Sequence, residues 1–396
     1  MFTEFDKTAM ARALELAALG MDSTDPNPRV GCVITRADRI IGEGWHERAG
    51  EAHAEVAALR SMEEGFADES RAAAGTAGGI PSGSAGGAAG ATVYVTLEPC
   101  SHFGRTPPCA DALIAAGVSR VVYAVVDPNP RVSGAGAAKL QEAGVLVESG
   151  LMEAEAIELN VGFMKRNQLG RPFVRLKLAM SLDGRTALAN GQSQWITSEV
   201  ARQDVQSWRA RSSAVMIGAG TLAADDPRLD VRLPGEDRRQ PMRVVLDARL
   251  RTSPDARLFT TGGQVLIFTS PDGGEDADPE AWAAAAARLS EQGARVEYAS
   301  AVGNRLDLDS VLARLAELEC NEVLLEAGAK LAGAFVQESL VDEMLLYVAP
   351  KLLGPQGFPL VEIPQLEMLE DAPGFVIYET AQVGDDLRIR LRPKER

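Results

Sequence analysis

The chain has 396 residues, 46% of them hydrophobic and 24% charged, and its formal net charge is −16 at pH 7. This length predicts about two globular domains. The acidic balance argues against a broad nucleic-acid-binding surface, because phosphate-backbone binding needs many clustered lysines and arginines. A few local arginines would still suffice to bind one small phosphorylated molecule.

The first twenty residues predict an amphipathic helix, with Thr3 and Asp6 placed as a capping box. They lack the basic start and the continuous apolar core of a signal peptide. No apolar run elsewhere approaches the roughly 20 residues that a membrane-spanning helix needs. We therefore expect a cytoplasmic protein that does not interact with a membrane.

Two strands are predicted next, over residues 29–35 and 39–45, and a helix follows over 51–62. Residues 65–91 are rich in Gly, Ala and Ser, which predicts a flexible surface loop. A strand over 92–100 ends at Cys100, and a second helix begins at Cys109. These elements bring the distinctive side chains of the first half to the ends of strands and helices.

His53, Cys100 and Cys109 are the ligand types of a catalytic zinc site that keeps one position for water. Glu55 follows His53 by two residues, and positions two apart on a helix diverge by about 200°. We therefore expect the imidazole to bind zinc while the longer carboxylate moves protons. Such a site favours hydrolytic deamination of an aminopyrimidine-like carbon.

Other interpretations of these residues remain open at this level. Cys100 and Cys109 could form a disulfide, although a reducing compartment disfavours one. The zinc could be structural if His102 supplied a fourth ligand. Cys32 is expected to be a buried apolar residue, and His46 could belong to the core or to the rim of a pocket.

The first half continues as a strand over 121–126, a helix over 134–144 and a strand over 145–149, an alternation typical of an α/β layer with a largely parallel sheet. Residues 151–171 are polar and helical, and end at Gly170-Arg171-Pro172. We expect a first domain over 1–150, a linker over 151–171 and a second domain over 172–396.

The second half also alternates between strands and helices, which predicts another α/β domain. Strands are expected over 173–185, 214–220, 243–248, 265–270, 322–328 and 342–350, helices near 198–211, 279–292, 310–318 and 330–339, and a terminal hairpin over 375–392. Gly328 and Gly333 lie where a strand enters a helix. They could let a helix N-terminus bind a pyrophosphate, or simply allow tight packing of strand and helix.

The motifs HAEVAALR, VTLEPCSHFGRTPPC, DPNPRVSGAG and PNPRVGCV resemble the deaminase half of the bifunctional riboflavin-biosynthesis deaminase/reductase family. The eight residues between Cys100 and Cys109 set the chain apart from nucleic-acid and cytidine deaminases, which have two. The resemblance implies a cytidine-deaminase-like zinc domain acting on a diaminopyrimidinone that carries a phosphoribosylamino group. It also implies that the substrate pocket includes Asn27, His102 and Arg105.

The motifs LKLAMSLDGRTA, SQWITS, DVQSWRAR, LAADDPRLDVR, LLEAGAKLAG and VDEMLLYVAPKLLG resemble the reductase half of the same family. This resemblance implies a dihydrofolate-reductase-like fold and hydride transfer from NADPH to C1′ of the opened ribose. It implies that NADPH contacts Ala179, Trp195, Thr221, Asp225, Gly328, Ala329, Lys330, Leu331, Ala332, Gly333 and Ala334. It implies that the substrate contacts Ser193, Arg209, Leu229, Arg232 and Glu326.

Four of these side chains also have a simpler interpretation. Arg209 and Arg232 suit phosphate binding but could be solvated surface charges. Trp195 could stack on a ring or fill the core, and Asp225 could belong only to a turn. The resemblance is the only indication of a homo-oligomer. The rival functions are a nucleic-acid-base deaminase with an accessory domain, and a non-enzymatic nucleotide sensor with structural zinc.

Overall fold

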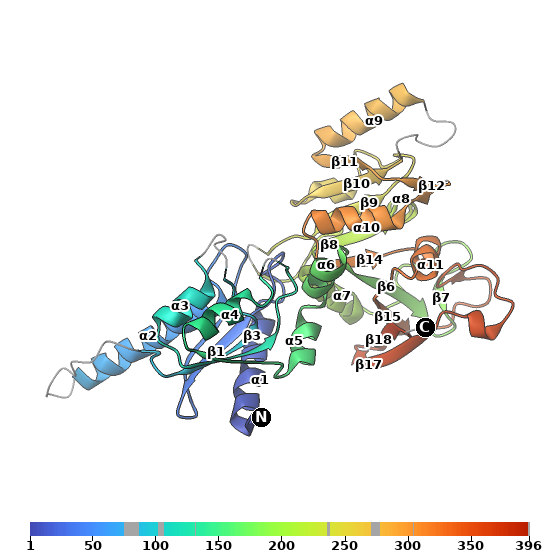
Figure 1. Ribbon diagram of the computed structural model, residues 1–396. Coiled ribbons are helices and arrows are strands. Elements are labelled where there is room, and N and C mark those ends of the chain that lie inside the picture. The colour runs from blue at the N-terminus through green and yellow to red at the C-terminus, as the bar shows by residue number, and fades with distance from the viewer. Residues whose placement is uncertain are drawn as a thin grey trace. The chain divides into compact units, whose positions relative to one another are not determined.

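The computed structural model describes residues 1–74, 87–101, 107–130, 132–235, 238–270, 278–303 and 305–394. The chain divides into two compact units, Met1–Leu169 and Gly170–Arg396 (Figure 1). Both units are α/β, as predicted. Among the described residues, no helix combines the length and the apolar composition needed to cross a bilayer.

The first unit is built on a five-stranded sheet in the order β2-β1-β3-β4-β5. The strands of the predicted alternation, β3, β4 and β5, are parallel as expected, whereas β1 pairs antiparallel with both β2 and β3. The strands are β1 (Gly31–Arg36), β2 (Arg39–Trp45), β3 (Thr92–Leu97), β4 (Arg120–Val125) and β5 (Leu146–Ser149).

Helices cover both faces of this sheet because its strands alternate their apolar side chains. Cys32 and Ile34 pack in one core with α2, α3 and α4, whereas Val33 packs in the other with α1, α5 and α6. The helices are α1 (Glu4–Leu19), α2 (Ala54–Ala74), α3 (Cys109–Ala115), α4 (Ala135–Glu142), α5 (Glu153–Leu159) and α6 (Val161–Leu169). Thr3 and Asp6 form the predicted capping box of α1.

The stretch expected as a linker contains α5 and α6, which are part of the first unit. The Asn160 side chain accepts a hydrogen bond from the Arg29 amide at 2.8 Å and donates one to the Arg29 carbonyl at 2.9 Å. Ala156 and Met164 are buried in the core beside α1. These contacts anchor both helices in the first unit, which ends at Leu169.

The expected loop over 65–91 is shorter than its composition suggested. Helix α2 continues to Ala74, since alanine and glutamate favour helix even where little is available to bury. At the other end, Ala88 and Ala91 are buried in the core at 2% and 0% exposure. The middle of the expected loop, residues 75–86, lies outside the described residues.

The second unit is built on a nine-stranded sheet in the order β11-β10-β9-β8-β14-β6-β15-β18-β17. Its first seven strands are parallel, and the terminal hairpin adds two antiparallel strands at the edge. The strands are β6 (Phe173–Ser181), β8 (Ala214–Gly218), β9 (Met242–Leu246), β10 (Val265–Thr269), β11 (Ala294–Tyr298), β14 (Glu322–Glu326), β15 (Glu343–Ala349), β17 (Phe375–Val383) and β18 (Asp386–Pro393).

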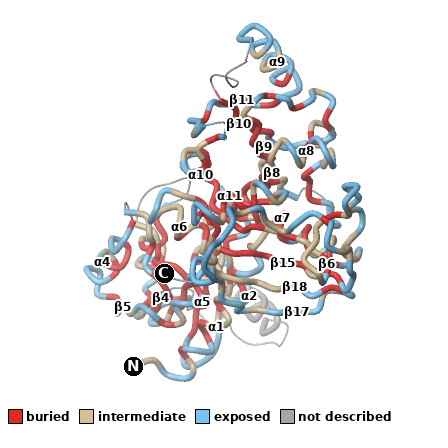
Figure 2. The backbone as a smooth tube through the Cα atoms, turned by 90° about the vertical axis from the view of Figure 1, so that its right-hand side faces the viewer, coloured by how far each residue is buried: buried red, intermediate tan, exposed pale blue. Residues whose placement is uncertain are grey.

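The central strands of the second unit are buried, as their near-continuous apolar sequences require (Figure 2). One core lies between the sheet and α10 and α11, and a second lies against α7, α8 and α9. The helices are α7 (Glu199–Arg211), α8 (Ala219–Asp225), α9 (Pro279–Glu291), α10 (Leu308–Glu317) and α11 (Ala329–Gln337). The unit also contains two short strand pairs, β7 (Arg185–Ala187) with β16 (Phe358–Pro359) and β12 (Ala301–Val302) with β13 (Arg305–Leu306). Two 3-10 helices are described as well, η1 (Arg257–Thr260) and η2 (Leu369–Asp371).

Candidate active sites

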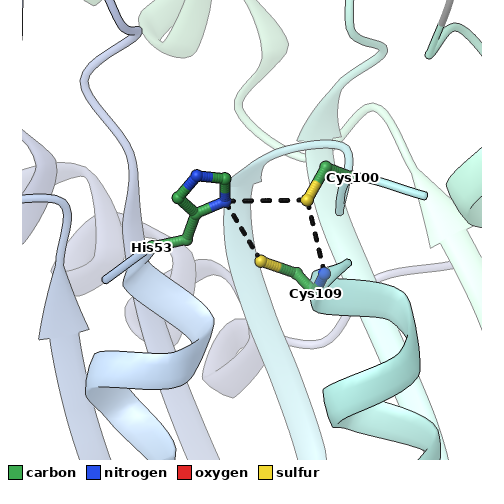
Figure 3. Close-up of side chains that lie close together, drawn as sticks. All are labelled: His53, Cys100 and Cys109. Carbon is green, nitrogen blue, oxygen red and sulfur yellow. Dashed lines mark hydrogen bonds between the residues drawn. The ribbon is translucent and has the colours of Figure 1, made fainter. Parts of the chain in front are cut away.

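Three side chains from separate elements converge in the first unit (Figure 3). His53 precedes α2, where its carbonyl accepts a hydrogen bond from the Ala57 amide at 3.0 Å. Cys100 follows β3, and Cys109 is the first residue of α3. The His53 Nδ1 atom lies 3.6 Å from the Cys100 sulfur and 3.2 Å from the Cys109 sulfur.

These distances fit zinc. Tetrahedral coordination with Zn–S of about 2.3 Å and Zn–N of about 2.0 Å places nitrogen and sulfur about 3.5 Å apart. The three ligand atoms lie within 4.8 Å of one another, and this group contains no fourth protein ligand among the described residues. Such a donor set suits a catalytic zinc site with an open position. His102 and Arg105 lie outside the described residues.

The two cysteine side chains differ in how readily they lose a proton. The Cys109 amide donates a hydrogen bond to the Cys100 sulfur at 3.3 Å, and both cysteines are free. A hydrogen bond from the Cys109 thiol, helped by His53 and opposed by burial, lowers the pKa of Cys100 to about 4. The same bond and burial raise the pKa of Cys109. Zinc binds cysteine as thiolate, so its binding would release any proton that remains on these two sulfurs.

Glu55 lies beside this group, in the first turn of α2, and is only 3% exposed. Burial, reinforced by the charge of Cys100, raises the pKa of Glu55, while His53 opposes the rise. A carboxylate with a raised pKa can take up and release a proton nearer to neutral pH. Glu55 is therefore a buried carboxyl beside the three possible zinc ligands.

Asn27 reaches this site through His46, which sequence reasoning left unassigned. The Asn27 amide nitrogen lies 3.0 Å from His46 Nε2, and His46 Nδ1 lies 3.0 Å from the Ala52 carbonyl oxygen. The His46 ring packs edge-on against His53, with 5.5 Å between the centroids. Burial lowers the pKa of His46. A neutral ring that accepts from Asn27 and donates to Ala52 satisfies both contacts.

The main chain just before Cys100 packs against the start of α4. The buried Glu98 carboxylate accepts hydrogen bonds from the backbone amides of Asp127, Gly134, Gly136 and Ala137, at 3.0 to 3.3 Å. A Cβ added at Gly136 would lie 1.8 Å from the carbonyl oxygen of Pro99. Only glycine allows the helix to approach the main chain that carries Cys100 so closely.

The second unit contains a cleft of about 750 Å³. It opens beside the carboxyl ends of β8 and β14, where α8 and α11 begin, which is where parallel sheets usually bind ligands. Most residues expected to contact cofactor or substrate line it: Ala179, Ser193, Thr221, Asp225, Leu229, Glu326, Gly328, Ala329, Lys330 and Leu331.

Other expected contacts lie elsewhere. Ala332, Gly333 and Ala334 are buried in the packing of α11. A Cβ at Gly333 would lie 1.8 Å from the Glu362 carbonyl oxygen, whereas a Cβ at Gly328 would meet nothing closer than 3.7 Å. Gly333 therefore serves tight packing, and Gly328 leaves its backbone open to the cleft.

Three more expected residues are bound to protein groups. Trp195 is 61% exposed and stacks on the Arg202 guanidinium, 4.3 Å from the ring centroid. Arg209 is only 7% exposed and forms two bonds to the Glu326 carboxylate, at 2.6 and 3.0 Å. The half-exposed Arg232 pairs with Asp230 at 2.6 Å. Arg209 therefore holds the Glu326 carboxylate in place.

Lys177 is a lining residue that sequence reasoning missed. It pairs in register with Glu326 across β6 and β14. Burial lowers the pKa of Lys177 and Arg209 adds to the effect, while Glu326 and Asp225 oppose it. The strand FVRLKLAMS offered a signal, since a lysine inside an apolar strand must find a polar environment.

Comparison with known proteins agrees with this architecture. Residues 3–125 match the cytidine and deoxycytidylate deaminase zinc-binding region, and residues 172–380 match the RibD C-terminal domain. The riboflavin biosynthesis protein RibD of Escherichia coli is 45% identical over 98% of this chain and 99% of its own.

Solved structures give the same result. That of Acinetobacter baumannii RibD is 42% identical, with a TM-score of 0.85 and 99% of each chain covered. A deaminase/reductase from Thermotoga maritima is 33% identical, with a TM-score of 0.80 and coverage of 98% of this chain and 99% of that one. The chain therefore belongs to the RibD family of bifunctional riboflavin-biosynthesis enzymes, with a deaminase domain followed by a reductase domain.

Proposed function

We propose that the two units act in sequence on one precursor. The first unit deaminates 2,5-diamino-6-(5-phosphoribosylamino)pyrimidin-4(3H)-one to 5-amino-6-(5-phosphoribosylamino)uracil. The second reduces this product with NADPH to 5-amino-6-(5-phosphoribitylamino)uracil. The Thermotoga maritima relative is named for the deaminase and the reductase of these compounds, which supports the choice of substrates.

The observation that carries the deaminase assignment is the convergence of His53, Cys100 and Cys109 beside Glu55. These three residues would hold zinc, which when bound lowers the pKa of a water molecule and supplies hydroxide at neutral pH. The Glu55 carboxylate accepts the proton of the attacking water. It then returns the proton to a ring nitrogen or to the departing amine.

In the second unit the cleft residues Thr221 and Asp225 and the N-terminal turn of α11 would hold the nicotinamide nucleotide. Bound NADPH supplies the hydride that adds to C1′ of the opened ribose. Hydride addition to C1′ of the opened, imine form breaks the C1′=N double bond, and the nitrogen takes up a proton. We assign this proton to Lys177 Nζ, which lines the cleft and whose pKa burial lowers, so that the ammonium is a better acid. Glu326, fixed by Arg209, lies beside Lys177 and would orient the ribose hydroxyls.

A coupled assay tests the proposal. The purified chain, the diaminopyrimidinone phosphate and NADPH should give loss of nicotinamide absorbance only after deamination. Glu55→Gln should keep about one zinc per chain and lose deamination, yet still reduce the uracil when it is supplied directly. Normal deamination by Glu55→Gln would contradict the role given to that residue. Absence of reduction with the supplied uracil would contradict the second half of the proposal.

The proposed partners are small molecules, and we place the protein in the cytoplasm. Support comes from Cys32, Cys100, Cys109 and Cys320, none of which is in a disulfide, a state that a reducing compartment preserves. The net charge of −16 supports a free pyrimidine over nucleic acid as substrate. Single-stranded nucleic acid offered in the same assay should not be deaminated.

A further inference from the structure

Two segments of the chain form one wall of the reductase cleft. They begin where β6 and β15 end, and these strands are parallel neighbours in the sheet (Figure 1). The wall consists of Thr186, Ala187, Gly191 and Ser193 from the first segment and Phe358, Pro359, Leu360 and Glu362 from the second. The residues proposed to hold the nucleotide follow β8 and β14 instead. This wall therefore lies on the side of the cleft that the proposed nucleotide site leaves to the pyrimidine phosphate.

The second segment, residues 351–362, which we call the strap, has little apolar packing over its first part. Leu352 is 74% exposed and Phe358 is 49% exposed. Residues 353–357 of the strap and residues 188–190 of the first segment line a cavity of about 400 Å³, so they are not packed tightly against each other. The position of this part of the strap therefore depends mainly on its hydrogen bonds.

Asp183, in the turn after β6, accepts hydrogen bonds from the strap. Its carboxylate accepts from the Leu353 amide at 3.1 Å and from the Gly354 amide at 2.8 Å. It also accepts from the Ser181 hydroxyl, and these bonds lower the pKa of Asp183 to about 2. The carboxylate is therefore ionised at neutral pH, and hydrogen bonds to an ionised acceptor are stronger than those to a neutral one.

The strap is anchored at its other end and joined to the first segment in between. The Glu362 amide donates a hydrogen bond to the Ala329 carbonyl at 3.0 Å. Between the two anchors, β16 pairs antiparallel with β7, with Phe358 opposite Ala187. The wall residues of the strap therefore lie between Asp183 and Ala329. A shift of the strap at Asp183 would move both paired strands and so the wall that they form.

We propose that Asp183 is a positioning residue of the reductase, which holds the strap so that its wall can bind the pyrimidine phosphate. The inference rests on the proposed reductase function. Among the described residues that line the cleft Asp183 is absent, so it acts through the strap and not on the substrate. Closing the turn after β6 would need only the Ser181 hydroxyl. The two amides come from residues 170 and 171 positions later in the chain, which a turn alone does not require.

Asp183→Asn in the full-length chain tests this inference. The amide offers one acceptor oxygen in place of two, and its NH2 group cannot accept from the strap. With the uracil supplied directly, we expect its KM to rise by about 10-fold, and kcat and the Kd for NADPH to change by less than about 3-fold. Deaminase turnover of the same variant is an internal control and should be unchanged. The matched control is Asp385→Asn, which removes an exposed carboxylate from the turn between β17 and β18 and should behave as wild type.

A second variant reaches the same wall independently. A Cβ at Gly357 would lie 2.7 Å from the Ala187 carbonyl oxygen, so Gly357→Ala should push the strap away from β7 and raise the same KM. This variant decides the question by the same measurements if Asp183→Asn does not fold.

The outcomes separate positioning from a purely structural role. A lower unfolding temperature with an unchanged KM for the uracil would overturn the inference, as would a Kd for NADPH that rises as much as this KM. Either result would leave the reductase proposal intact. A wild type that does not reduce the supplied uracil with NADPH would instead contradict the proposed function.

Discussion

Gly136→Ala should weaken zinc binding although it replaces none of the proposed zinc ligands. The added Cβ would lie 1.8 Å from the Pro99 carbonyl oxygen. A close carbon–oxygen contact is about 3.3 Å, so Pro99 or the start of α4 must move by about 1.5 Å. Cys100 is the next residue, and zinc tolerates deviations of only about 0.2 Å in ligand distance. We therefore expect zinc affinity to fall by about 100-fold, the upper range for altered support of a metal ligand.

Zinc content after dialysis against a graded chelator measures this loss, and deaminase kcat/KM should fall in parallel. Reductase turnover with supplied uracil is the internal control, because its cleft is lined by residues of the second unit. Ala138→Ser changes an exposed position of the same helix and should behave as wild type. Thermal unfolding shows whether the first unit remains folded. A folded Gly136→Ala variant that keeps zinc and deaminates normally would refute the reasoning.

Three further predictions concern the second unit. Lys177→Met should lower reductase kcat by about 100-fold at pH 7 with little change in NADPH affinity, and an unchanged kcat would exclude the proton role. Gly333→Ala should lower the unfolding temperature, because its Cβ would lie 1.8 Å from the Glu362 carbonyl oxygen. The control is Gly262→Ala, whose Cβ would have no atom within 4 Å and which should leave the unfolding temperature unchanged. Burial raises the pKa of Glu343, but Arg175 and Arg390 outweigh it and lower the pKa from 4.5 to about 2. Ionised Glu343 therefore stabilises the fold above pH 4.5, and about 3 kcal/mol of the free energy of unfolding should be lost as the pH falls towards 2. Urea unfolding at several pH values measures this loss. The pH dependence should be weaker in Glu343→Gln.

The residues of the zinc site could be predicted because their chemistry is distinctive and their positions are local. A histidine and two cysteines near element ends have few common uses together, and the ends of β3 and α3 follow from short-range patterns. The strands and helices of the second unit were likewise readable from alternating apolar runs. The sequence could not predict that β1 pairs antiparallel with β3, since this pairing joins strands that are separated by more than fifty residues of chain.

Residues with two interpretations were resolved only by tertiary contacts. Arg209 and Arg249 are the same residue type, yet one is buried against Glu326 and the other lines a cavity without a partner among the described residues. Gly328 and Gly333 lie five positions apart, and only the backbone of Glu362 distinguishes an open glycine from a packed one.

Sequence by itself thus determined which reactive groups this protein carries and the local elements that present them. The tertiary structure decided which of those groups are free to act. The physical reason is that a side chain's chemistry is intrinsic, whereas its burial, pairing and pKa are set by residues distant in the chain. Lys177 illustrates this, because its pKa depends first on its burial and then on Glu326, Arg209 and Asp225.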